Sequence, residues 1–590
     1  MRELVSTPNP GKMTRDPVPA ETQMRMPKPA LACISHHSIT AQDAEERSEK
    51  REVRSEKREV LSTRSSILIS SAFAFLCVLC GEKSGLALLA AEGASPYFAI
   101  TVVDADTGRG VPLVELRTVN EIRCFTDSNG VVAFDEPGLM NQKVFFYVQS
   151  DGYEFPKDGF GCRGVALEVK PGGSATLKLN RLNIAERLYR ITGQGIYRDS
   201  LLVGQPLPIR QPLLNAQVLG QDSVQTAEYR GKLYWFWGDT HKPSYPLGHF
   251  GTAGATSPLP PSRGREGGGG GPGLDPAKGI ELAYFTDDAG FSRPMCNVPG
   301  EGMKWLDGLV MVPDETGAER LVAHFARMKT LDQALERGWV IFSDKTETFE
   351  LLASWPLDEP RWPCSQAFRH RVGEQDYVYF AWPFPYVRVK ADVKAIKDPH
   401  AYEAFTPLMP GSRYVKGQAK LERSPNRQLI WDWKADTGFI TQPQQKELLD
   451  AGQLESSEVK FKFVDVEARR PVFAHAGSVA FNPYRKRWIM LFDAEWARPS
   501  ILGEVYYAEA EAPEGPWLQA QKIVTHAKYS FYNVKHHLLF DQEGGRIIYF
   551  EGTYTKMFTD IAVPTPRYEY NQIMYRLDLA HPRLKMPAGK

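Results

Sequence analysis

Two aspartates stand at the outer ends of a strongly aromatic hairpin in this 590-residue sequence. Asp222 opens the first strand, the turn falls at Arg230–Lys232, and Asp239 closes the second strand after the run Tyr234–Trp237. A hairpin brings its two outer ends to the same edge of the sheet, so both carboxylates are expected on one side. Carboxylates that converge in this way can perform general acid/base chemistry, in which one protonates a leaving oxygen and the other activates water.

The same succession of strand, turn and aromatic strand recurs downstream. The five units begin near residues 222, 305, 365, 475 and 534. Each opening pair is followed by further strands, and repeats of four strands are typical of blades arranged around an axis. We therefore predict an all-β protein in which residues 216–590 form a five-bladed β-propeller. A β-sandwich enzyme is the alternative fold for this region.

Two insertions interrupt the predicted propeller, at residues 257–276 and 390–452. The first contains a proline- and glycine-rich tract and is expected to be a disordered surface loop. The second is polar and predicts a helix over Gln442–Ala451. After it, Lys460–Val464 is expected to continue the third blade as an outer strand.

The start of each first strand and the end of each second strand face the funnel of a propeller. These positions hold the candidate catalytic carboxylates, which are Asp222, Asp239, Asp307, Glu495 and Glu551. The candidate substrate-binding residues are Trp237, His241, Arg327, Trp382, His475, His536 and Tyr554. A funnel of low dielectric separates the pKa values of converging carboxylates, so that one stays protonated near neutrality. With aromatic faces available to sugar rings, this set suits hydrolysis of a carbohydrate.

Three short motifs resemble the five-bladed glycosidase propellers of the arabinanase and β-xylosidase kind. They are Asp222 with the hairpin Gly231–Trp235, the segment Trp305–Asp307, and the segment Ala512–Trp517. The stretch Gly231–Thr240 also resembles propellers of the DUF4185 type. The resemblance implies a glycoside hydrolase that acts on a polysaccharide or oligosaccharide. It also implies that Asp222 is the general base and that Asp307 orients and tunes the site.

The sequence departs from this family at the third blade. The family's general acid is a glutamate at the opening of that blade, where this chain has Ser365–Gln366. The acid must then come from elsewhere, and Glu551 ranks ahead of Glu495 because it ends an aromatic strand. Without such an acid, the protein would be a non-catalytic carbohydrate-binding scaffold. A polysaccharide lyase, the third alternative, would instead use Tyr554, His536 and Arg327.

Several candidates also have a purely structural interpretation. Asp239 and Asp307 could cap a strand end or a turn, and Glu495 could be an ordinary exposed loop acid. Asp493 could hold a structural divalent cation such as calcium together with a neighbouring carbonyl. No other cofactor is expected, because the sequence contains no recognised nucleotide or metal motif.

The N-terminal part has a different organisation. Residues 1–66 are polar and repetitive and are predicted to be disordered. Residues 67–94 hold an apolar run between a basic flank and small residues, an order typical of a secretory signal and compatible with an N-terminal membrane anchor. We therefore expect a protein that is secreted, periplasmic or at the cell surface, in which Cys124 and Cys162 could form a disulfide.

Residues 95–180 predict a small β-sandwich, because short alternating strands are separated by Gly, Asp and Asn turns. The stretches Val102–Leu116, Thr126–Phe134 and Phe145–Phe155 resemble the carboxypeptidase-regulatory-like, transthyretin-like domain. Residues 181–215 form a connector to the propeller. The 71 basic and 71 acidic residues give a formal net charge of zero, which lacks the basic excess of a nucleic-acid-binding protein. Nothing in the sequence identifies a protein partner.

Overall fold

The structure is a computed structural model that describes residues 95–261, 274–497 and 500–586. The expectations for residues 1–94 and for the proline- and glycine-rich tract at 262–273 lie outside this range. The described chain is nearly all β. Its α-helices are short: α2 (Arg198–Leu202), α3 (Val393–Lys397) and α4 (Gln442–Asp450). None of the helices in these residues is long and apolar enough to cross a membrane.

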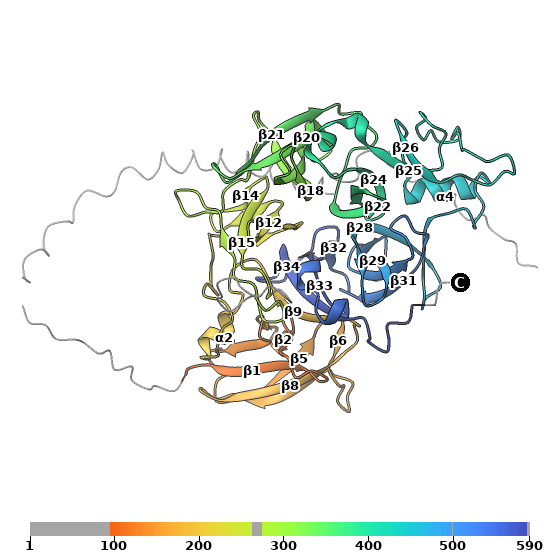
Figure 1. Ribbon diagram of the computed structural model, residues 1–590. Helices are drawn as coiled ribbons and strands as arrows, with labels where there is room; N and C mark the ends of the chain where they lie inside the picture. The colour runs from red at the N-terminus through yellow and green to blue at the C-terminus, as the bar shows by residue number, and fades with distance from the viewer. Residues whose placement is uncertain (1–94, 262–273, 498–499, 587–590) are drawn as a thin grey trace, which may run out of the picture. The chain divides into compact units, whose positions relative to one another are not determined.

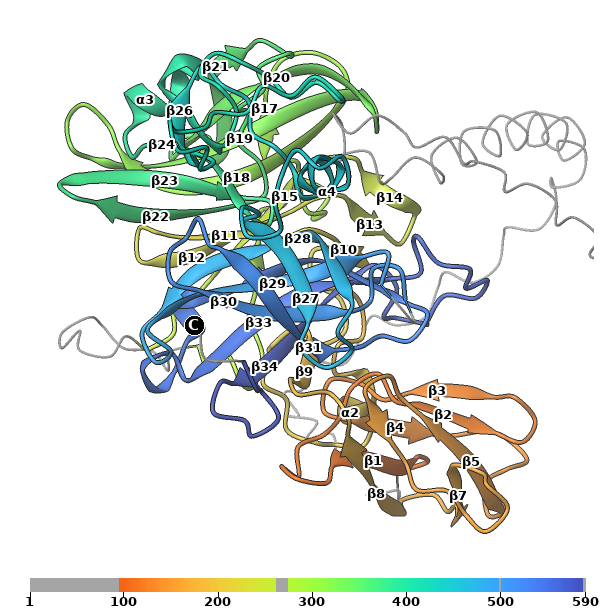
Figure 2. The same ribbon diagram turned by 90° about the vertical axis from the view of Figure 1, so that its right-hand side faces the viewer.

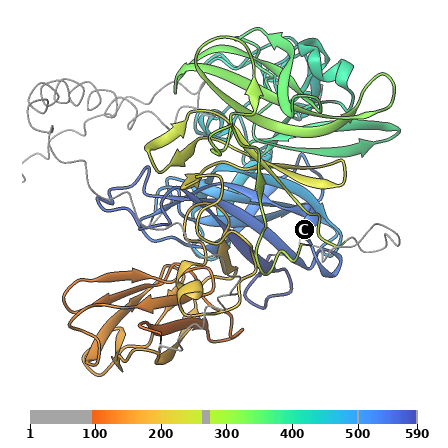
Figure 3. The ribbon, with the colours of Figure 1, turned by 90° about the vertical axis from the view of Figure 1, so that its left-hand side faces the viewer.

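Two four-stranded sheets form the N-terminal part, shown in orange in Figures 1, 2 and 3. The first has the order β4 (Val131–Phe134), β1 (Phe98–Asp104), β8 (Ser174–Arg181), β6 (Tyr153–Glu154). The second has the order β3 (Arg123–Phe125), β2 (Glu115–Thr118), β5 (Lys143–Gln149), β7 (Gly164–Glu168). Buried and less buried residues alternate along β1, as expected for a strand with one face on a core. Ile100 and Val102 of β1 share that core with Leu116 of β2 and Phe146 of β5.

Five larger sheets follow in the described residues, each built mainly from antiparallel neighbours. The first consists of β11 (Gln225–Tyr229), β12 (Lys232–Trp237), β15 (Ala253–Ser257) and β16 (Ala283–Tyr284). Beside it lies a small sheet of β10 (Gly220–Gln221), β13 (Thr240–Lys242) and β14 (Tyr245–His249). The second has the order β17 (Cys296–Asn297), β21 (Thr348–Trp355), β20 (Gln333–Ser343), β19 (Glu319–Thr330), β18 (Met303–Pro313).

The remaining three sheets continue this arrangement. The third consists of β22 (Gln366–Val372), β23 (Gln375–Ala381), β24 (Pro385–Lys390), β25 (Glu403–Thr406) and β26 (Asp432–Ala435). The fourth consists of β27 (Phe461–Asp465), β28 (Pro471–Asn482), β29 (Arg487–Glu495), β30 (Val505–Ala510) and β31 (Trp517–Val524), and closes on itself. The fifth has the order β32 (Ser530–His536), β33 (Ile547–Thr555), β34 (Asn571–Asp578), β9 (Glu186–Arg190). A strand that precedes the first sheet in sequence therefore completes the fifth.

The strands that begin the five predicted units, here called first strands, are β11, β18, β22, β28 and β32, and they lie next to one another in sequence order. Contacts join β11 to β18, β18 to β22, β22 to β28, and β28 to β32. The fifth sheet in turn meets the beginning of the first, where the backbone N–H of Ser223 donates to Oγ1 of Thr553 (3.1 Å). The Nε2 group of Gln366 in the third sheet also reaches the carbonyl of Val224 (3.0 Å). Residues at the openings of distant sheets are thus brought together.

Aromatic rings fill the spaces between successive sheets. The ring centroids of Tyr234 and Phe342, from the first and second sheets, are 5.5 Å apart. Those of Trp339 and Phe380, from the second and third, are 5.8 Å apart. These pairs show why the second strand of each unit is so aromatic: one of its faces packs against the neighbouring sheet.

Residues 390–452 differ from the expected insertion. They supply β25 and β26 to the third sheet as well as α4, which begins after a capping box formed by Thr441 and Gln444. The expectation that Lys460–Val464 continues the third blade is wrong. The corresponding strand β27 pairs with β28 and β31 and belongs to the fourth sheet.

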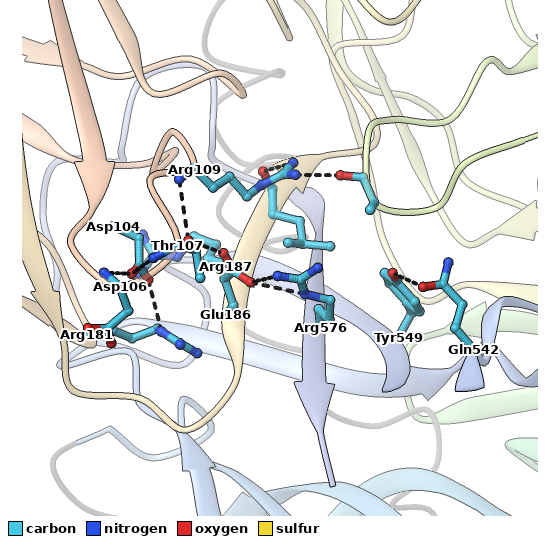
Figure 4. A network of polar contacts seen from close by, with 12 residues as sticks. Asp104, Asp106, Thr107, Arg109, Arg181, Glu186, Arg187, Gln542, Tyr549 and Arg576 are labelled. Carbon is cyan, nitrogen blue, oxygen red and sulfur yellow. Dashed lines mark hydrogen bonds and ion pairs between the residues drawn. The ribbon is translucent and has the colours of Figure 1, made fainter. Parts of the chain in front are cut away.

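Polar contacts join the N-terminal sheets to the fifth sheet, as Figure 4 shows. The hydroxyl of Thr107 donates to Glu186 on β9 (2.9 Å), and Glu186 accepts from Arg576 on β34. Arg109 donates to the carbonyl groups of Leu188 (3.2 Å) and Ala277 (2.6 Å). The strand that completes the fifth sheet is therefore also held by the N-terminal part.

Candidate functional site

In four of the five units, a left-handed residue lies just before the first strand or within it. These residues are Ser223, Gly308, Ser365 and Asn533, with φ of 55°, 60°, 64° and 55°. A non-glycine residue in this conformation is uncommon, and a bulge or turn of this kind re-aims the adjacent side chain. The residues immediately before them are Asp222, Asp307, Cys364 and Tyr532. These four positions correspond in backbone geometry, and two of them are predicted catalytic carboxylates.

Asp222 is almost completely buried and holds contacts to two sheets. Its Oδ2 accepts a hydrogen bond from the hydroxyl of Tyr532 (2.7 Å), and its Oδ1 accepts one from the backbone N–H of Asp239 (3.1 Å). Gly238 permits this approach, since a Cβ there would lie 2.2 Å from Oδ1 of Asp222. Asp222 and Asp239 are therefore neighbours at one edge of the hairpin, as the sequence predicts.

The groups around Asp222 are held in their neutral forms. Burial raises the pKa of Tyr532 well above its usual value, and the negative charge of Asp222 raises it further. Tyr570 is affected in the same way. Burial lowers the pKa of His241 to about 4, although Asp222 opposes this effect. At neutral pH the two tyrosines keep their protons and His241 is uncharged.

Asp239 connects the first sheet to the second. The indole Nε1 of Trp305 donates to Oδ1 of Asp239 (2.7 Å). Trp305 lies on β18, two residues before Asp307. The two carboxylates Asp239 and Asp307 are thus linked by a tryptophan of the motif Trp305–Asp307.

Asp307 faces His324 across the first two strands of the second sheet. The two residues are direct cross-strand partners, and Oδ1 of Asp307 lies 2.8 Å from Nδ1 of His324. The side chain of Asp307 is 26% exposed, whereas that of His324 is 2% exposed. Within the described chain, the buried Nε2 of His324 makes no hydrogen bond. The imidazole therefore orients the more accessible carboxylate.

Tryptophans extend from this pair towards the third sheet. The rings of His324 and Trp362 are stacked, with centroids 6.4 Å apart and an interplanar angle of 27°. The centroid of Trp382 lies 6.4 Å from that of Trp362, and the guanidinium of Arg337 lies over Trp362 at 4.4 Å. The predicted residue Trp382 is thus joined to Asp307 through Trp362 and His324.

The fourth sheet repeats the carboxylate–imidazole pair in reverse order. Nδ1 of His475 on β28 lies 2.8 Å from Oδ2 of Asp493 on β29. Burial lowers the pKa of His475, but the carboxylates of Asp493 and Glu495 outweigh this effect and leave the pKa raised. Burial, assisted by the charge of Asp493, raises the pKa of Glu495 above its usual value. Glu495 is only half-buried, so it combines access with a tendency to stay protonated.

Glu551 lies in the interior rather than with the residues above. Its carboxyl group is completely buried and lies 2.7 Å from Nε2 of His537, whose ring is 5.2 Å from that of Trp235 in the first sheet. Burial raises the pKa of Glu551 well above its usual value. Burial also lowers the pKa of Lys535, the cross-strand neighbour of Glu551, to about 8. This carboxyl group is enclosed between sheets and is not joined to Asp222 or Asp307.

Four predicted substrate-binding residues are held in separate contacts. Trp237 is 1% exposed and stacks on Trp235, with centroids 6.0 Å apart. The other three contacts are Arg327 with Glu336 (3.0 Å), His536 with Asp541 (2.8 Å), and Tyr554 stacked on Tyr529 (4.1 Å between centroids). The structure does not bring these four side chains to the carboxylates.

Several residues close to the carboxylates are not among the predicted site residues, and three of them join different sheets. These three are Tyr532, Trp305 and Trp362. A usable signal exists for Tyr532, because it precedes Asn533 just as Asp222 precedes Ser223 and Asp307 precedes Gly308. Small and Asn residues tolerate the left-handed conformation, so these pairs mark equivalent positions just before or within the first strands.

Two further expectations concern cysteine and metal. Neither Cys124 nor Cys162 forms a disulfide, so the suggested bridge between them is wrong. In the parts of the chain that the structure describes, no group of three or more His, Cys, Asp or Glu side chains is arranged to hold a metal ion. No such group of side chains therefore supports the calcium site suggested for Asp493.

No protein-family model and no curated protein matches the sequence. Among solved structures, an exo-β-1,3-galactanase from Phanerochaete chrysosporium is similar with a TM-score of 0.31 and 10% identity, over 61% of each chain and thus less than two thirds of the galactanase. A GH43_1 enzyme from Xanthomonas citri has a TM-score of 0.31 and 12% identity, over 64% of this chain and 92% of the other. An exo-1,5-α-L-arabinanase from a bovine ruminal metagenomic library has a TM-score of 0.29 and 7% identity, over 61% and 94%. At these scores the comparisons support no inference about function.

Proposed function

We propose that the protein is a glycoside hydrolase whose site lies at the openings of a five-bladed β-propeller, preceded by a small β-sandwich. The adjacency of successive first strands supports the propeller, as does the completion of the fifth sheet by β9. The shared core of the two N-terminal sheets supports the sandwich. The transthyretin-like resemblance of that part remains a prediction.

One observation carries the functional proposal. Hydrogen bonds run from Tyr532 to Asp222, and from Trp305 to Asp239, while Asp222 and Asp239 are themselves joined. Trp305 and Asp307 lie two residues apart on the same strand, β18. Side chains from the fifth, first and second sheets therefore surround several carboxylates with aromatic rings. Glycoside hydrolysis needs this combination of carboxylate chemistry and apolar faces for sugar rings.

The proposed role of Asp222 follows from its hydrogen bonds, and those of Asp307 and Glu495 follow from their exposure and from the local charges. Asp222 activates water, because two hydrogen-bond donors hold its carboxylate in a fixed orientation. Asp307, held by His324, orients the sugar. Glu495 replaces Glu551 as the proposed general acid, because it is accessible and its pKa is raised. Trp362 and Trp382 offer ring faces to the substrate.

A reducing-sugar assay over a panel of plant, algal and cell-wall polysaccharides tests this proposal. The wild type should release reducing ends from at least one substrate, and Asp222→Asn should lower that rate by about 10²–10⁴-fold. Asp376→Asn provides a matched control, because Asp376 forms an exposed ion pair with Arg371 beside the turn between β22 and β23. Equal loss of rate in both variants, or full activity in Asp222→Asn, would contradict the assignment.

A non-catalytic carbohydrate-binding protein is the second candidate. It is favoured by the third sheet, where Cys364 occupies the position of Asp222 and Asp307, and Gln366 donates to the carbonyl of Val224. This candidate predicts glycan binding without release of reducing ends. The lyase alternative has no comparable support, because Tyr554, His536 and Arg327 lie in separate contacts.

We also keep secretion, with a periplasmic or cell-surface location, as a proposal. It rests on the sequence of residues 67–94 alone. Fractionation of the producing cells and determination of the mature N-terminus test it. A mature chain that begins after residue 94 agrees with export, whereas a cytosolic chain that retains residues 67–94 contradicts it.

A further inference from the structure

A cavity of about 200 Å³ lies between the N-terminal sheets and the segment that leads into β34. Its wall combines residues 123–133, residues 190–199 and residues 566–568, so three parts of the chain meet there. Its charged lining consists of Arg123, Arg190, Arg198, Arg567, Asp127 and Asp199. Four guanidinium groups thus face two carboxylates, which leaves an excess of positive charge along the wall of this cavity.

The two aspartates are already engaged by the protein. Asp127 accepts hydrogen bonds from the backbone N–H groups of Asn129 (3.0 Å), Val131 (3.2 Å) and Ser200 (2.7 Å), so it stabilises a turn. Asp199 pairs with Arg198 (3.2 Å) and Arg567 (3.3 Å) and also accepts from the backbone of Ala133 (3.1 Å). Neither carboxylate forms an ion pair with Arg190 in the described structure.

Arg190 is the least compensated of the four arginines. It is 2% exposed, its terminal N–H groups donate to the carbonyls of Arg567 and Gln194, and its Nε has no hydrogen-bond partner in the described chain. Its guanidinium lies over the ring of Tyr568 at 5.0 Å. Burial lowers the pKa of Arg190 to about 10, so the group is still a cation at neutral pH. A buried cation without a counter-ion is costly, and an anion in the cavity would offset that cost.

The thiol of Cys124, which also lines the cavity, does not supply a negative charge to Arg190. Burial, assisted by Asp199, raises the pKa of the Cys124 thiol to about 11, so the thiol is neutral near pH 7. Guanidinium groups bind oxyanions through charge-assisted hydrogen bonds. A water molecule occupies about 30 Å³ of liquid, so a cavity of about 200 Å³ has room for one small oxyanion and a few waters.

We propose that this cavity binds a small oxyanion (a phosphate, sulfate or carboxylate group) through Arg190, Arg198 and Arg567. The ligand would touch both the N-terminal sheets and the segment before β34, and would therefore strengthen their contact. The cavity wall contains none of the carboxylates of the proposed hydrolase site, and the proposal neither requires nor excludes catalysis.

Thermal unfolding of the full chain in titrations of phosphate, sulfate and glucuronate tests the proposal, with sodium chloride at equal ionic strength as the reference. A ligand that binds only the folded state raises the unfolding temperature in proportion to the logarithm of its concentration above the Kd. We expect one of the three anions to act at the lowest concentration, which identifies the source of the oxyanion. A response no larger than that of chloride for all three overturns the proposal.

Variants locate the effect. Arg567→Gln and Arg198→Gln remove partly exposed cations from the wall and should each raise the midpoint of the titration by tenfold or more. Arg210→Gln is the matched control, because Arg210 is 88% exposed and is not part of the cavity wall. Asp199→Asn should have the opposite effect and lower the midpoint, since it removes a carboxylate that competes for the same arginines. Equal midpoints in the wall variants and in Arg210→Gln, or weaker binding by Asp199→Asn, overturn the proposal.

Discussion

The hydroxyl of Tyr532 donates a 2.7 Å hydrogen bond to Oδ2 of Asp222, although 310 residues separate the two in the sequence. Both residues precede a left-handed residue, which is Ser223 just before β11 and Asn533 within β32. The bond therefore joins equivalent positions of the fifth and first sheets. The bond also fixes the orientation of the Asp222 carboxylate, to which we assign water activation. A variant that lacks the bond therefore tests the orientation of this carboxylate while the carboxylate itself is still present.

Replacing Tyr532 with Phe should lower both activity and stability. The buried carboxylate of Asp222 loses one donor, which costs about 2 kcal/mol of unfolding free energy. Misorientation of the carboxylate should lower kcat by about 10²-fold, with a smaller change in KM. Tyr506→Phe is a matched control, since Tyr506 donates a comparable buried hydrogen bond to Asp465 (3.0 Å) in the fourth sheet. Similar kcat losses in the two variants would show that the effect is only structural.

Gly238→Ala should disturb the same carboxylate from the other side. The added Cβ would lie 2.2 Å from Oδ1 of Asp222, so the hairpin end and the carboxylate must separate. Overpacking of this kind costs about 1–3 kcal/mol. Hydrolysis should fall with it, as measured by initial rates and by urea unfolding. Gly159→Ala, with no atom within 4 Å of the added Cβ, should change neither quantity. Wild-type activity in Gly238→Ala contradicts the role given to this contact.

The sequence alone predicts the opening carboxylates because their local patterns are strong. Asp222 and Asp307 stand beside turn-forming residues and aromatic strands, and these features are visible without the fold. Tyr532 is harder to find, because the sequence pattern predicts that the fifth unit begins two residues later, at Val534. The extra residue of a bulge shifts the register by one, and such a shift reverses which side chains face the site.

Glu551 illustrates the second difficulty. Its position at the end of an aromatic strand suggests access to the funnel, but its side chain lies on the face that packs against Trp235 and His537. The direction of a strand residue depends on its cross-strand partner, here Lys535, and that pairing follows from the register of the whole sheet. The His324–Trp362 stack is likewise a contact between sheets, which no local pattern encodes.

The pair formed by His475 and Asp493 should make stability depend on pH. The folded pKa of His475 is raised above its unfolded value near 6.5, so its protonation stabilises the folded state below that value. This stabilisation is lost as the pH rises through the folded pKa. Urea unfolding at several pH values should therefore show that the difference between wild type and His475→Gln shrinks above about pH 6.5. A gap that widens with pH contradicts the prediction.

The choice between Glu495 and Glu551 as general acid can be decided by two amide variants. Glu551→Gln should keep hydrolysis near the wild-type rate and change stability by about 1 kcal/mol or less. The raised pKa of Glu551 favours its neutral form in the folded protein, and glutamine has the same shape without charge. Far-UV circular dichroism and urea unfolding establish that both variants are folded before their rates are compared.

Glu495→Gln should instead lower the rate by about 10²–10⁴-fold and change the pH profile. The raised pKa of Glu495 keeps its carboxyl group protonated above the usual range, and the rate falls as that proton is lost at higher pH. The glutamine has no proton to lose, so the residual rate should show no such alkaline decrease. A good leaving group needs little protonation, so an aryl glycoside should restore much of the rate in Glu495→Gln. If the aryl glycoside instead rescues Glu551→Gln, and Glu495→Gln retains full activity, the acid is the buried carboxyl group and the two assignments must be exchanged.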